Sequence, residues 1–163
     1  MNLLEKLEQG WQKLASNLDS KQQAERKLLE ALQRDYAEEI GLAEALKKQS
    51  ENVPYDHLRQ KLLNIAEAEQ RHAEMLREKI RELGGEVKAR RLTGDSLSTL
   101  DLLKILEEEK EEYTEYLNAR ALAQEAERED IRELLERIRE EEVLHRKQLM
   151  DVLSRLNPLP IER

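Results

Sequence analysis

The stretch from Asp130 to Leu156, DIRELLERIREEEVLHRKQLMDVLSRL, decides the fold of this chain. Its apolar residues recur at alternating steps of four and three, which places them on one face of a helix. Two polar residues interrupt that apolar stripe in the middle. The stripe consists of Ile131, Leu135, Ile138, Glu142, His145, Leu149, Val152 and Leu156. This pattern predicts a core-facing helix that carries a Glu-x-x-His pair on its buried side.

An earlier stretch repeats the arrangement with the same spacing. Glu142 and His145 each lie 73 positions after Glu69 and His72. The earlier stripe consists of Leu58, Leu62, Ile65, Glu69, His72, Leu76, Lys79 and Leu83. Within each pair, both side chains leave the same side of the helix about one turn apart, as two ligands of one metal would. The alternative is a chance coincidence in a Glu-rich helical protein. Because unpaired carboxylates are rarely buried, the metal-ligand interpretation is favoured.

The composition indicates one all-α domain without secreted or membrane features. The chain has 163 residues, 39% of them charged and 3% aromatic, with five Gly and no Phe; this is typical of helices built from Glu, Lys, Arg, Leu and Ala. The absence of Cys excludes disulfides, thiolate metal sites and a cysteine nucleophile. No signal peptide or membrane-spanning run is recognisable, so we expect a soluble cytoplasmic protein. A net charge of −8 with both signs mixed argues against nucleic-acid binding.

The expected order of elements is a short N-terminal helix over residues 1–18, a four-helix bundle over residues 20–156 and a tail over residues 157–163. Together they form one domain. The apolar side of the N-terminal segment should cover the bundle or a partner subunit. Asp19 or Ser20 is the expected cap of the first long helix. Pro54 marks the start of the second helix and Gly84-Gly85 its end.

The connection between the second and third helices is long. Ser96 or Ser98 is the expected cap of the third helix, so the connection must cross the length of the bundle: about 39 Å, bridged by a segment that reaches about 46 Å when extended. Such a taut crossover can also bridge to a neighbouring subunit, which makes a helix-swapped dimer an alternative. A turn is expected near Glu125 to Asp130, although no Gly or Pro marks it and one continuous helix from Leu97 to Leu156 is the local alternative.

The internal repeat supplies further candidate ligands. A shift of 74 positions places Asp35 on Glu109 and Glu38 on Glu112. Each half of the chain then offers two carboxylates on one helix and a Glu-x-x-His pair on the next. Glu39 competes with Glu38 for the first-helix position, because it lies near the same stripe. The candidate metal ligands are Asp35, Glu38, Glu69, His72, Glu109, Glu112, Glu142 and His145.

At these residues the chain resembles the rubrerythrin-type ferritin-like proteins. The run EKEEYTEY from Glu109 to Tyr116 is similar to the third-helix motif of that family, in which two glutamates three apart precede Tyr-Thr-Glu. The two Glu-x-x-His pairs resemble the second- and fourth-helix motifs. The additional Glu38 is similar to the extra glutamate of the symerythrin branch. The resemblance implies an all-α, ferritin-like four-helix bundle with a di-iron carboxylate site.

A site with many carboxylates and two imidazoles suits two Fe ions, with Mn or a mixed pair as alternatives. The resemblance implies reduction of hydrogen peroxide or O2. Glu112 is the candidate mobile ligand, with Glu38 as its counterpart. Because the chain lacks a Cys-bearing rubredoxin domain, electrons would come from an external donor such as a rubredoxin-like protein. The alternatives are a ferroxidase that feeds an iron store and a helical interaction module with a structural or vestigial site. We expect a homodimer rather than a cage, because Asn157-Pro158-Leu159-Pro160 blocks a fifth helix.

Overall fold

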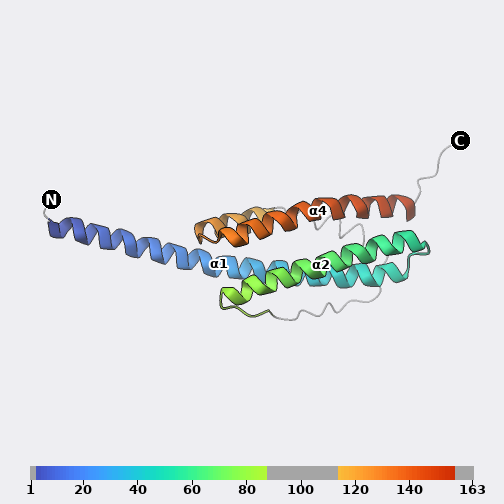
Figure 1. Cartoon of the computed structure of the whole chain (residues 1–163), viewed down its shortest axis with the longest axis horizontal. Coiled ribbons are helices and arrows are strands. Elements are labelled where there is room, and N and C mark those ends of the chain that lie inside the picture. Colours follow the sequence, from blue (N-terminus) through green and yellow to red (C-terminus); the bar gives the residue numbers. More distant parts are fainter. Residues whose placement is uncertain (1–2, 88–113, 157–163) are drawn as a thin grey trace.

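The computed structural model describes residues 3–87 and 114–156 of an all-α four-helix bundle (Figure 1). The described elements are α1 (Leu3–Glu51), α2 (Asp56–Glu82), a helical segment over residues 114–125, and α4 (Glu129–Leu156). Helix α2 packs against both α1 and α4. The expected long crossover beyond residue 87 and the candidate third-helix ligands Glu109 and Glu112 lie outside the described residues. No helix among the described residues is long and apolar enough to cross a membrane.

Helix α1 is one uninterrupted helix of 49 residues, so the helix boundary expected at Asp19 or Ser20 is wrong. The physical reason is that no Gly or Pro lies between Gly10 and Gly41 to break the helix. The hydroxyl of Ser20 donates to the carbonyl oxygen of Asn17 at 2.9 Å, a bond made inside a helix rather than at its start. The N-terminal part of α1 therefore extends beyond the bundle as a single helix (Figure 1).

Helices α2 and 114–125 end in the same way, although only one ends at a glycine. After α2, the N–H groups of Leu83, Gly84 and Gly85 donate to carbonyl groups four, three and five residues earlier. The N–H groups following segment 114–125 repeat this pattern at residues 126–128. Gly84 (φ 76°) and Glu127 (φ 56°) occupy the left-handed position of each cap. The turn expected between Glu125 and Asp130 is thus confirmed.

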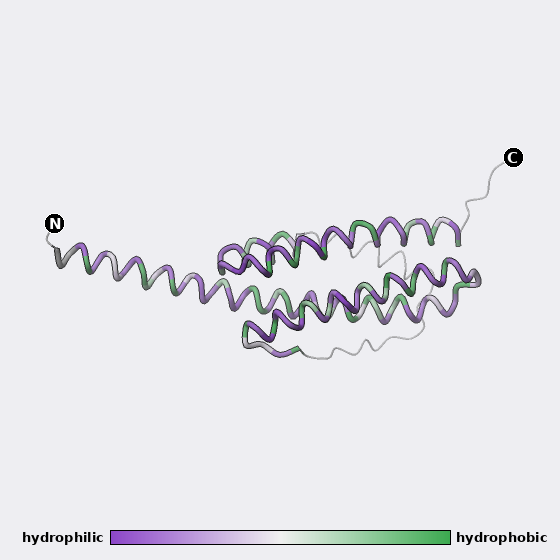
Figure 2. Tube along the Cα trace, viewed as in Figure 1, coloured by the Kyte–Doolittle hydropathy of each residue, from purple (hydrophilic) through white to green (hydrophobic). Residues whose placement is uncertain are grey.

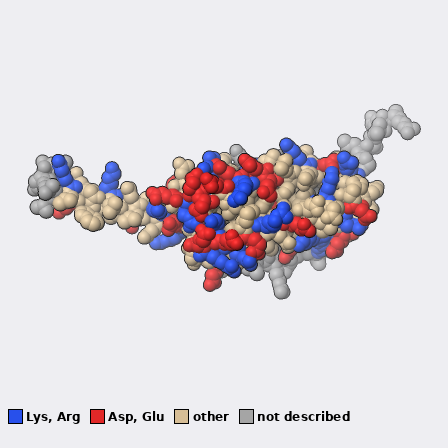
Figure 3. Space-filling model, viewed as in Figure 1, with Lys and Arg blue, Asp and Glu red and all other residues tan. Residues whose placement is uncertain are grey.

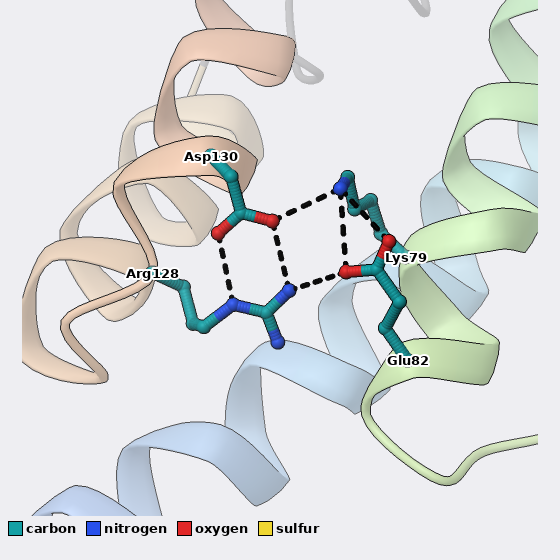
Figure 4. A network of polar contacts seen from close by, with 4 residues as sticks. All are labelled: Lys79, Glu82, Arg128 and Asp130. Atoms are coloured by element: carbon teal, nitrogen blue, oxygen red, sulfur yellow. Dashed lines mark hydrogen bonds and ion pairs between the residues drawn. The ribbon is translucent and has the colours of Figure 1, made fainter.

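A network of four charged residues joins the C-terminal end of α2 to this turn (Figure 4). The guanidinium of Arg128 donates to both carboxylate oxygens of Asp130, at 2.9 and 2.8 Å, and to Glu82 at 2.7 Å. Lys79 Nζ lies 3.0 Å from both Asp130 and Glu82. Because each group contacts two others, the network fixes the start of α4 beside the end of α2.

Two apolar clusters form the core, and a polar layer separates them along the helices. Hydrophobic and hydrophilic positions alternate along each helix (Figure 2). One cluster includes Leu28, Leu32, Leu76, Ile80, Ile131 and Leu135. The other includes Leu46, Leu58, Leu62, Ile65, Leu149 and Val152. The residues that lie between the two clusters in sequence include the polar Glu39, Glu69, His72, Glu142 and His145. The candidate ligands are therefore flanked by apolar core on both sides.

Candidate metal centre

The two Glu-x-x-His pairs meet in the interior of the bundle. Glu69 and His72 of α2 are completely buried, at 0% exposure. His72 Nδ1 lies 3.1 Å from Glu69 Oε2 and 3.0 Å from Glu142 Oε1 of α4. His145 Nδ1 lies 2.9 Å from Glu69 Oε1, and the two imidazole rings stack with centroids 5.7 Å apart. Helical spacing on two neighbouring stripes thus produces one carboxylate–imidazole cluster.

Two further carboxylates complete the surroundings of His72. Glu39 of α1 places Oε2 at 3.7 Å from His72 Nδ1. Glu141 of α4 places Oε2 at 3.0 Å from His72 Nε2, on the opposite side of the ring. One ligand atom from each of Glu39, Glu69, His72 and Glu142 lies within 4.8 Å of the others, which is close enough to hold one metal ion. Glu141 instead contacts the ring nitrogen that faces away from this group.

The burial of so many acids shifts their protonation. Burial raises the pKa of Glu39 well above its usual range, and the neighbouring Glu69 and Glu142 raise it further. Burial alone would also raise the pKa of Glu69, but contacts with His145 and His72 outweigh it and hold that pKa below its usual value. Glu69 is therefore the carboxylate held as an anion, while Glu39 favours its neutral form when no metal is bound.

The histidines respond in the opposite way. Burial alone would lower the pKa of His72, but Glu142, Glu39 and Glu69 outweigh it and raise the pKa to about 12. Glu142 and Glu69 likewise outweigh burial at His145 and raise its pKa to about 9. The cluster without metal thus retains protons that compensate the carboxylate charge. A bound cation could replace these protons, which is what a metal site requires.

Three buried atoms of the cluster indicate what would satisfy it. Within the described residues, Glu69 Oε1, Glu142 Oε1 and His145 Nδ1 have no well-aligned hydrogen-bond partner. They nevertheless face one another, since His145 Nδ1 lies 2.9 Å from Glu69 Oε1 and 3.6 Å from Glu142 Oε1. Carboxylate oxygens and imidazole nitrogens are ligands of Fe, Mn and Zn. The residues therefore fit a transition-metal centre.

A second acidic group adjoins the cluster. Asp35, Glu38 and Glu115 bring one carboxylate oxygen each within 4.8 Å of the others. Burial, followed by the charges of Glu38 and Glu115, raises the pKa of Asp35 to about 7. A cavity of about 70 Å³ is lined by this group and also by Glu39 and Glu142. The cavity therefore joins the second acidic group to the metal cluster.

The structure divides the candidate ligands into three sets. Glu69, His72, Glu142 and His145 come together in the cluster. Asp35 and Glu38 lie in the neighbouring acidic group, while Glu39 contributes the α1 carboxylate beside His72. The third set, Glu109 and Glu112, lies outside the described residues.

The sequence did not predict the contact of Glu141, and it left open whether Glu38 or Glu39 contacts the cluster. Glu39 lies seven residues after Leu32 and seven before Leu46, both completely buried, and this spacing was the available signal for its inward position. Glu141 lies seven residues after the buried Leu134, but Glu142 occupies the regular stripe next to it, so the helix period did not select Glu141. Only the position of α4 against α2 reveals its contact with His72.

Comparisons with known proteins agree with this description of an all-α bundle around a carboxylate–histidine cluster. Residues 29–159 match the ferritin-like domain, and the chain belongs to this family. The ferritin-like superfamily expected from the sequence is thus confirmed, whereas the rubrerythrin-like subtype stays a prediction. No curated protein matches the chain significantly.

Two solved structures share the fold. A bacterioferritin from Desulfovibrio desulfuricans, described as having a diiron site in different catalytic states, matches with a TM-score of 0.73 and 24% identity over 86% of each chain. A protein from Xanthomonas campestris pv. campestris matches with a TM-score of 0.72 and 18% identity, over 82% of this chain and 92% of that one. At these identities, the likeness establishes the fold alone.

Proposed function

We propose that this protein is a di-iron carboxylate oxidoreductase that reduces hydrogen peroxide or O2 with electrons from an external donor. The observation that carries the proposal is the buried cluster of Glu69, His72, Glu142 and His145 between two apolar cores. Hard carboxylate oxygens with two imidazoles favour iron, with manganese as the alternative. The chain has no Cys, so a separate redox protein or small reductant must supply the electrons.

The residues of the cluster have distinct roles in this proposal. His72, His145 and the carboxylates of Glu39, Glu69 and Glu142 would hold the metal. When bound, two ferrous ions supply the two electrons needed to reduce an O–O bond. Glu141 Oε2 lies 3.0 Å from His72 Nε2. In the metal-bound form, Glu141 would accept the Nε2–H, and the deprotonated Nδ1 would be the ligand atom. Glu39 also lines the cavity, so its carboxylate faces the space in which the oxidant would bind.

The cavity has room for a small oxidant beside the cluster. Its volume is about 70 Å³, and one water molecule needs only about 10–15 Å³ by the same measure, so O2 and hydrogen peroxide fit. Its lining also includes apolar side chains, Leu42, Leu76, Leu135 and Ile138. The cavity is therefore compatible with a small oxidant.

A ferroxidase is the second candidate, favoured by the acidic group of Asp35, Glu38 and Glu115. These carboxylates line the same cavity and would attract Fe(II) as a substrate toward the cluster. The shared fold with a bacterioferritin, a protein described as having a diiron site, is compatible with this candidate. In the ferroxidase, Fe(III) would leave the cluster for a store, whereas in the reductase it would be reduced in place.

Metal analysis and kinetics separate these candidates. Protein purified without chelator should hold about two transition-metal ions per chain, and replacing Glu69 and Glu142 with Ala together should abolish that occupancy. Glu39→Gln should weaken metal binding, while the matched change Glu38→Gln should leave the histidine cluster loaded. Unchanged metal content in the double variant would contradict the metal centre and favour an interaction module.

Stopped-flow oxidation of the di-ferrous protein then identifies the reaction. A peroxide reductase should be oxidised much faster by hydrogen peroxide than by O2, and should return to the ferrous state when a reductant is added. A ferroxidase should continue to consume added Fe(II) with O2 and accumulate ferric mineral. An O2 rate equal to or above the peroxide rate, with continued Fe(II) uptake, would overturn the reductase assignment.

A further inference from the structure

The N-terminal part of α1 has an apolar seam that touches nothing in the described part of the bundle. Every residue from 6 to 20, which we call the α1 arm, is exposed. Leu7, Trp11, Leu14 and Leu18 are 53%, 70%, 53% and 54% exposed. They follow one another at steps of four, three and four, which aligns them along one side of the helix. The arm projects away from the bundle (Figure 1).

The seam continues the pattern that packs the bundle itself. Glu25 and the buried Leu32 lie seven and fourteen residues after Leu18. Lys21 and the buried Leu28 lie seven and fourteen residues after Leu14. Lys21 is the residue at which the seam leaves the bundle, and its ammonium binds Glu127 there. The arm thus has a core-type face on which no helix of the described residues packs.

An isolated arm would also be a weak helix. Fewer than about 15 residues rarely form a stable helix alone in water, because most helical stability comes from packing of the apolar face. The arm contains Gly10, which lowers its intrinsic helix propensity further. A packing partner along the seam would account for the continuation of α1 through residues 6–20.

The charge pattern indicates the partner. The arm contains two basic residues, Lys6 and Lys13, and two acidic ones, Glu8 and Asp19, whereas the whole chain carries −8. Charged side chains are accordingly sparse on the arm and dense on the body in the face shown in Figure 3. Two copies of the chain repel one another through their bodies but not through their arms. The arm is therefore where two copies can approach without opposing net charges.

The positions beside the seam favour the same partner. Glu8, Gly10, Ala15 and Asn17 flank it, and Glu8 is the only charged residue among them. In a two-helix coiled coil, these flanking positions face the partner helix, and like charges there would prevent pairing of identical chains. Small side chains at 10 and 15 also allow close approach. A membrane surface is disfavoured, because interfacial helices are typically rich in Lys and Arg on their polar face.

We propose that the α1 arm is a self-association element: the seam of Leu7, Trp11, Leu14 and Leu18 packs against the same seam of a second copy of this chain. The pairing is a short two-helix coiled coil outside the bundle. It leaves the metal cluster and the cavity of each copy open, and it does not depend on the proposed function. Because only four apolar side chains per copy are buried, the association is weak and depends on protein concentration.

Trp11 is the only Trp of the chain, so its fluorescence reports on the seam directly. With rising protein concentration, its emission should shift to shorter wavelength as the indole leaves water, while the mass in sedimentation rises from 19.2 kDa toward twice that value. In the Leu7→Glu/Leu14→Glu variant, both changes should disappear. Its metal content, and its circular dichroism melting at dilutions at which both proteins are monomers, should match those of the unchanged protein, because both side chains lie outside the bundle.

A matched control adds the same charges to the other side of the arm. Gln9→Glu/Ser16→Glu has the same spacing but faces away from the seam, and it should associate like the unchanged protein. Three results would overturn the proposal: a monomer at all concentrations, association that the Leu7→Glu/Leu14→Glu variant retains, or a Trp11 shift that occurs only when anionic lipid vesicles are added.

Discussion

His72 contacts carboxylates through both of its ring nitrogens. Nδ1 faces Glu69, Glu142 and Glu39, while Nε2 lies 3.0 Å from Glu141. A histidine that binds metal through one nitrogen commonly donates the other N–H to a carboxylate, which fixes the ring orientation and the tautomer. Glu141 is thus a positioning residue for His72 rather than a member of the inner group.

This role predicts the effect of Glu141→Gln. The amide cannot accept the N–H as strongly as a carboxylate, so metal affinity should fall by roughly 10- to 100-fold while the bundle still folds. Competition with a chelator measures the affinity, and the melting temperature of the metal-free protein reports on folding. Glu140→Gln makes the same chemical change one residue earlier at an exposed position. Equal affinities for the two variants would contradict a positioning role for Glu141.

For individual residues, the sequence predicted an inward direction where they lie on a strong apolar stripe. It did not decide the direction of the others. Glu69, His72, Glu142 and His145 replace core residues within regular four-and-three spacing, so their inward direction followed from the helix period alone. Glu38 and Glu39 are adjacent, and the α1 period admits either one. The choice depends on how α1 is rotated against α2, which is a property of packing between helices.

Two helices of this chain end in the same conformation, one with a glycine and one without. Gly84 and Glu127 occupy the same left-handed position after α2 and after segment 114–125, with the same pattern of backbone hydrogen bonds. The conformation is free of strain only for Gly, because a Cβ atom crowds the following carbonyl oxygen. Arg128 bonds to Asp130 and Glu82 next to Glu127, so the charged network helps to hold the turn where no glycine is present.

Two substitutions test this comparison. Gly84→Ala should lower the free energy of unfolding by about 1 kcal/mol, and Glu127→Gly should raise it by about 0.5 kcal/mol. Urea unfolding measures both, with an unchanged dependence on urea concentration. Glu127→Gln is the control, since it removes the charge pair with Lys21 but keeps the side chain in the left-handed conformation. Stabilisation by Glu127→Gln equal to that by Glu127→Gly would assign the effect to charge instead of strain.

The element boundaries were predictable where proline or glycine marks them and not elsewhere. Pro54 and Gly84 bracket α2, and both ends agree with the structure. The turn at residues 126–128 contains neither. It was expected because the first half of the chain turns at the matching position, and because one continuous helix would hold Glu109 and Glu142 about 50 Å apart. At Asp19 and Ser20, capping residue types were present without a break, because Ser20 bonds back into the helix that continues through it.

The whole molecule places a group of mutually repelling carboxylates between two apolar cores. Without metal, protons must compensate that charge. Burial, with Glu38 and Glu115, raises the pKa of Asp35 from 3.8 to about 7. Contacts with Glu142 and Glu69 outweigh burial and raise the pKa of His145 from 6.5 to about 9. At any pH between the unfolded and the folded pKa of each group, the metal-free folded chain therefore binds more protons than the unfolded chain.

The sign of the pH dependence follows from this difference. Where the folded state binds more protons, stability falls as the pH rises, so the metal-free protein should lose stability from about pH 4 through pH 9. Glu69 acts in the opposite direction, because its lowered pKa contributes stability that is lost only as the pH falls below its ordinary 4.5. Above pH 5, the slope is determined by the groups whose pKa is raised, which are Asp35, Glu39, His72 and His145.

Metal reverses this behaviour, because binding requires deprotonated ligands and becomes tighter as protons leave. The melting temperature of metal-free protein should therefore decrease between pH 5 and pH 9, while that of the loaded protein should not. The difference between the two should increase by at least about 3 °C, the shift that 1 kcal/mol produces in a domain of this size. Calorimetric scans of both forms across this range measure it.

In the Glu69→Ala/Glu142→Ala variant, the difference should vanish at every pH, because the metal no longer binds. A metal-free protein that gains stability from pH 5 to pH 9 would contradict the protonated cluster.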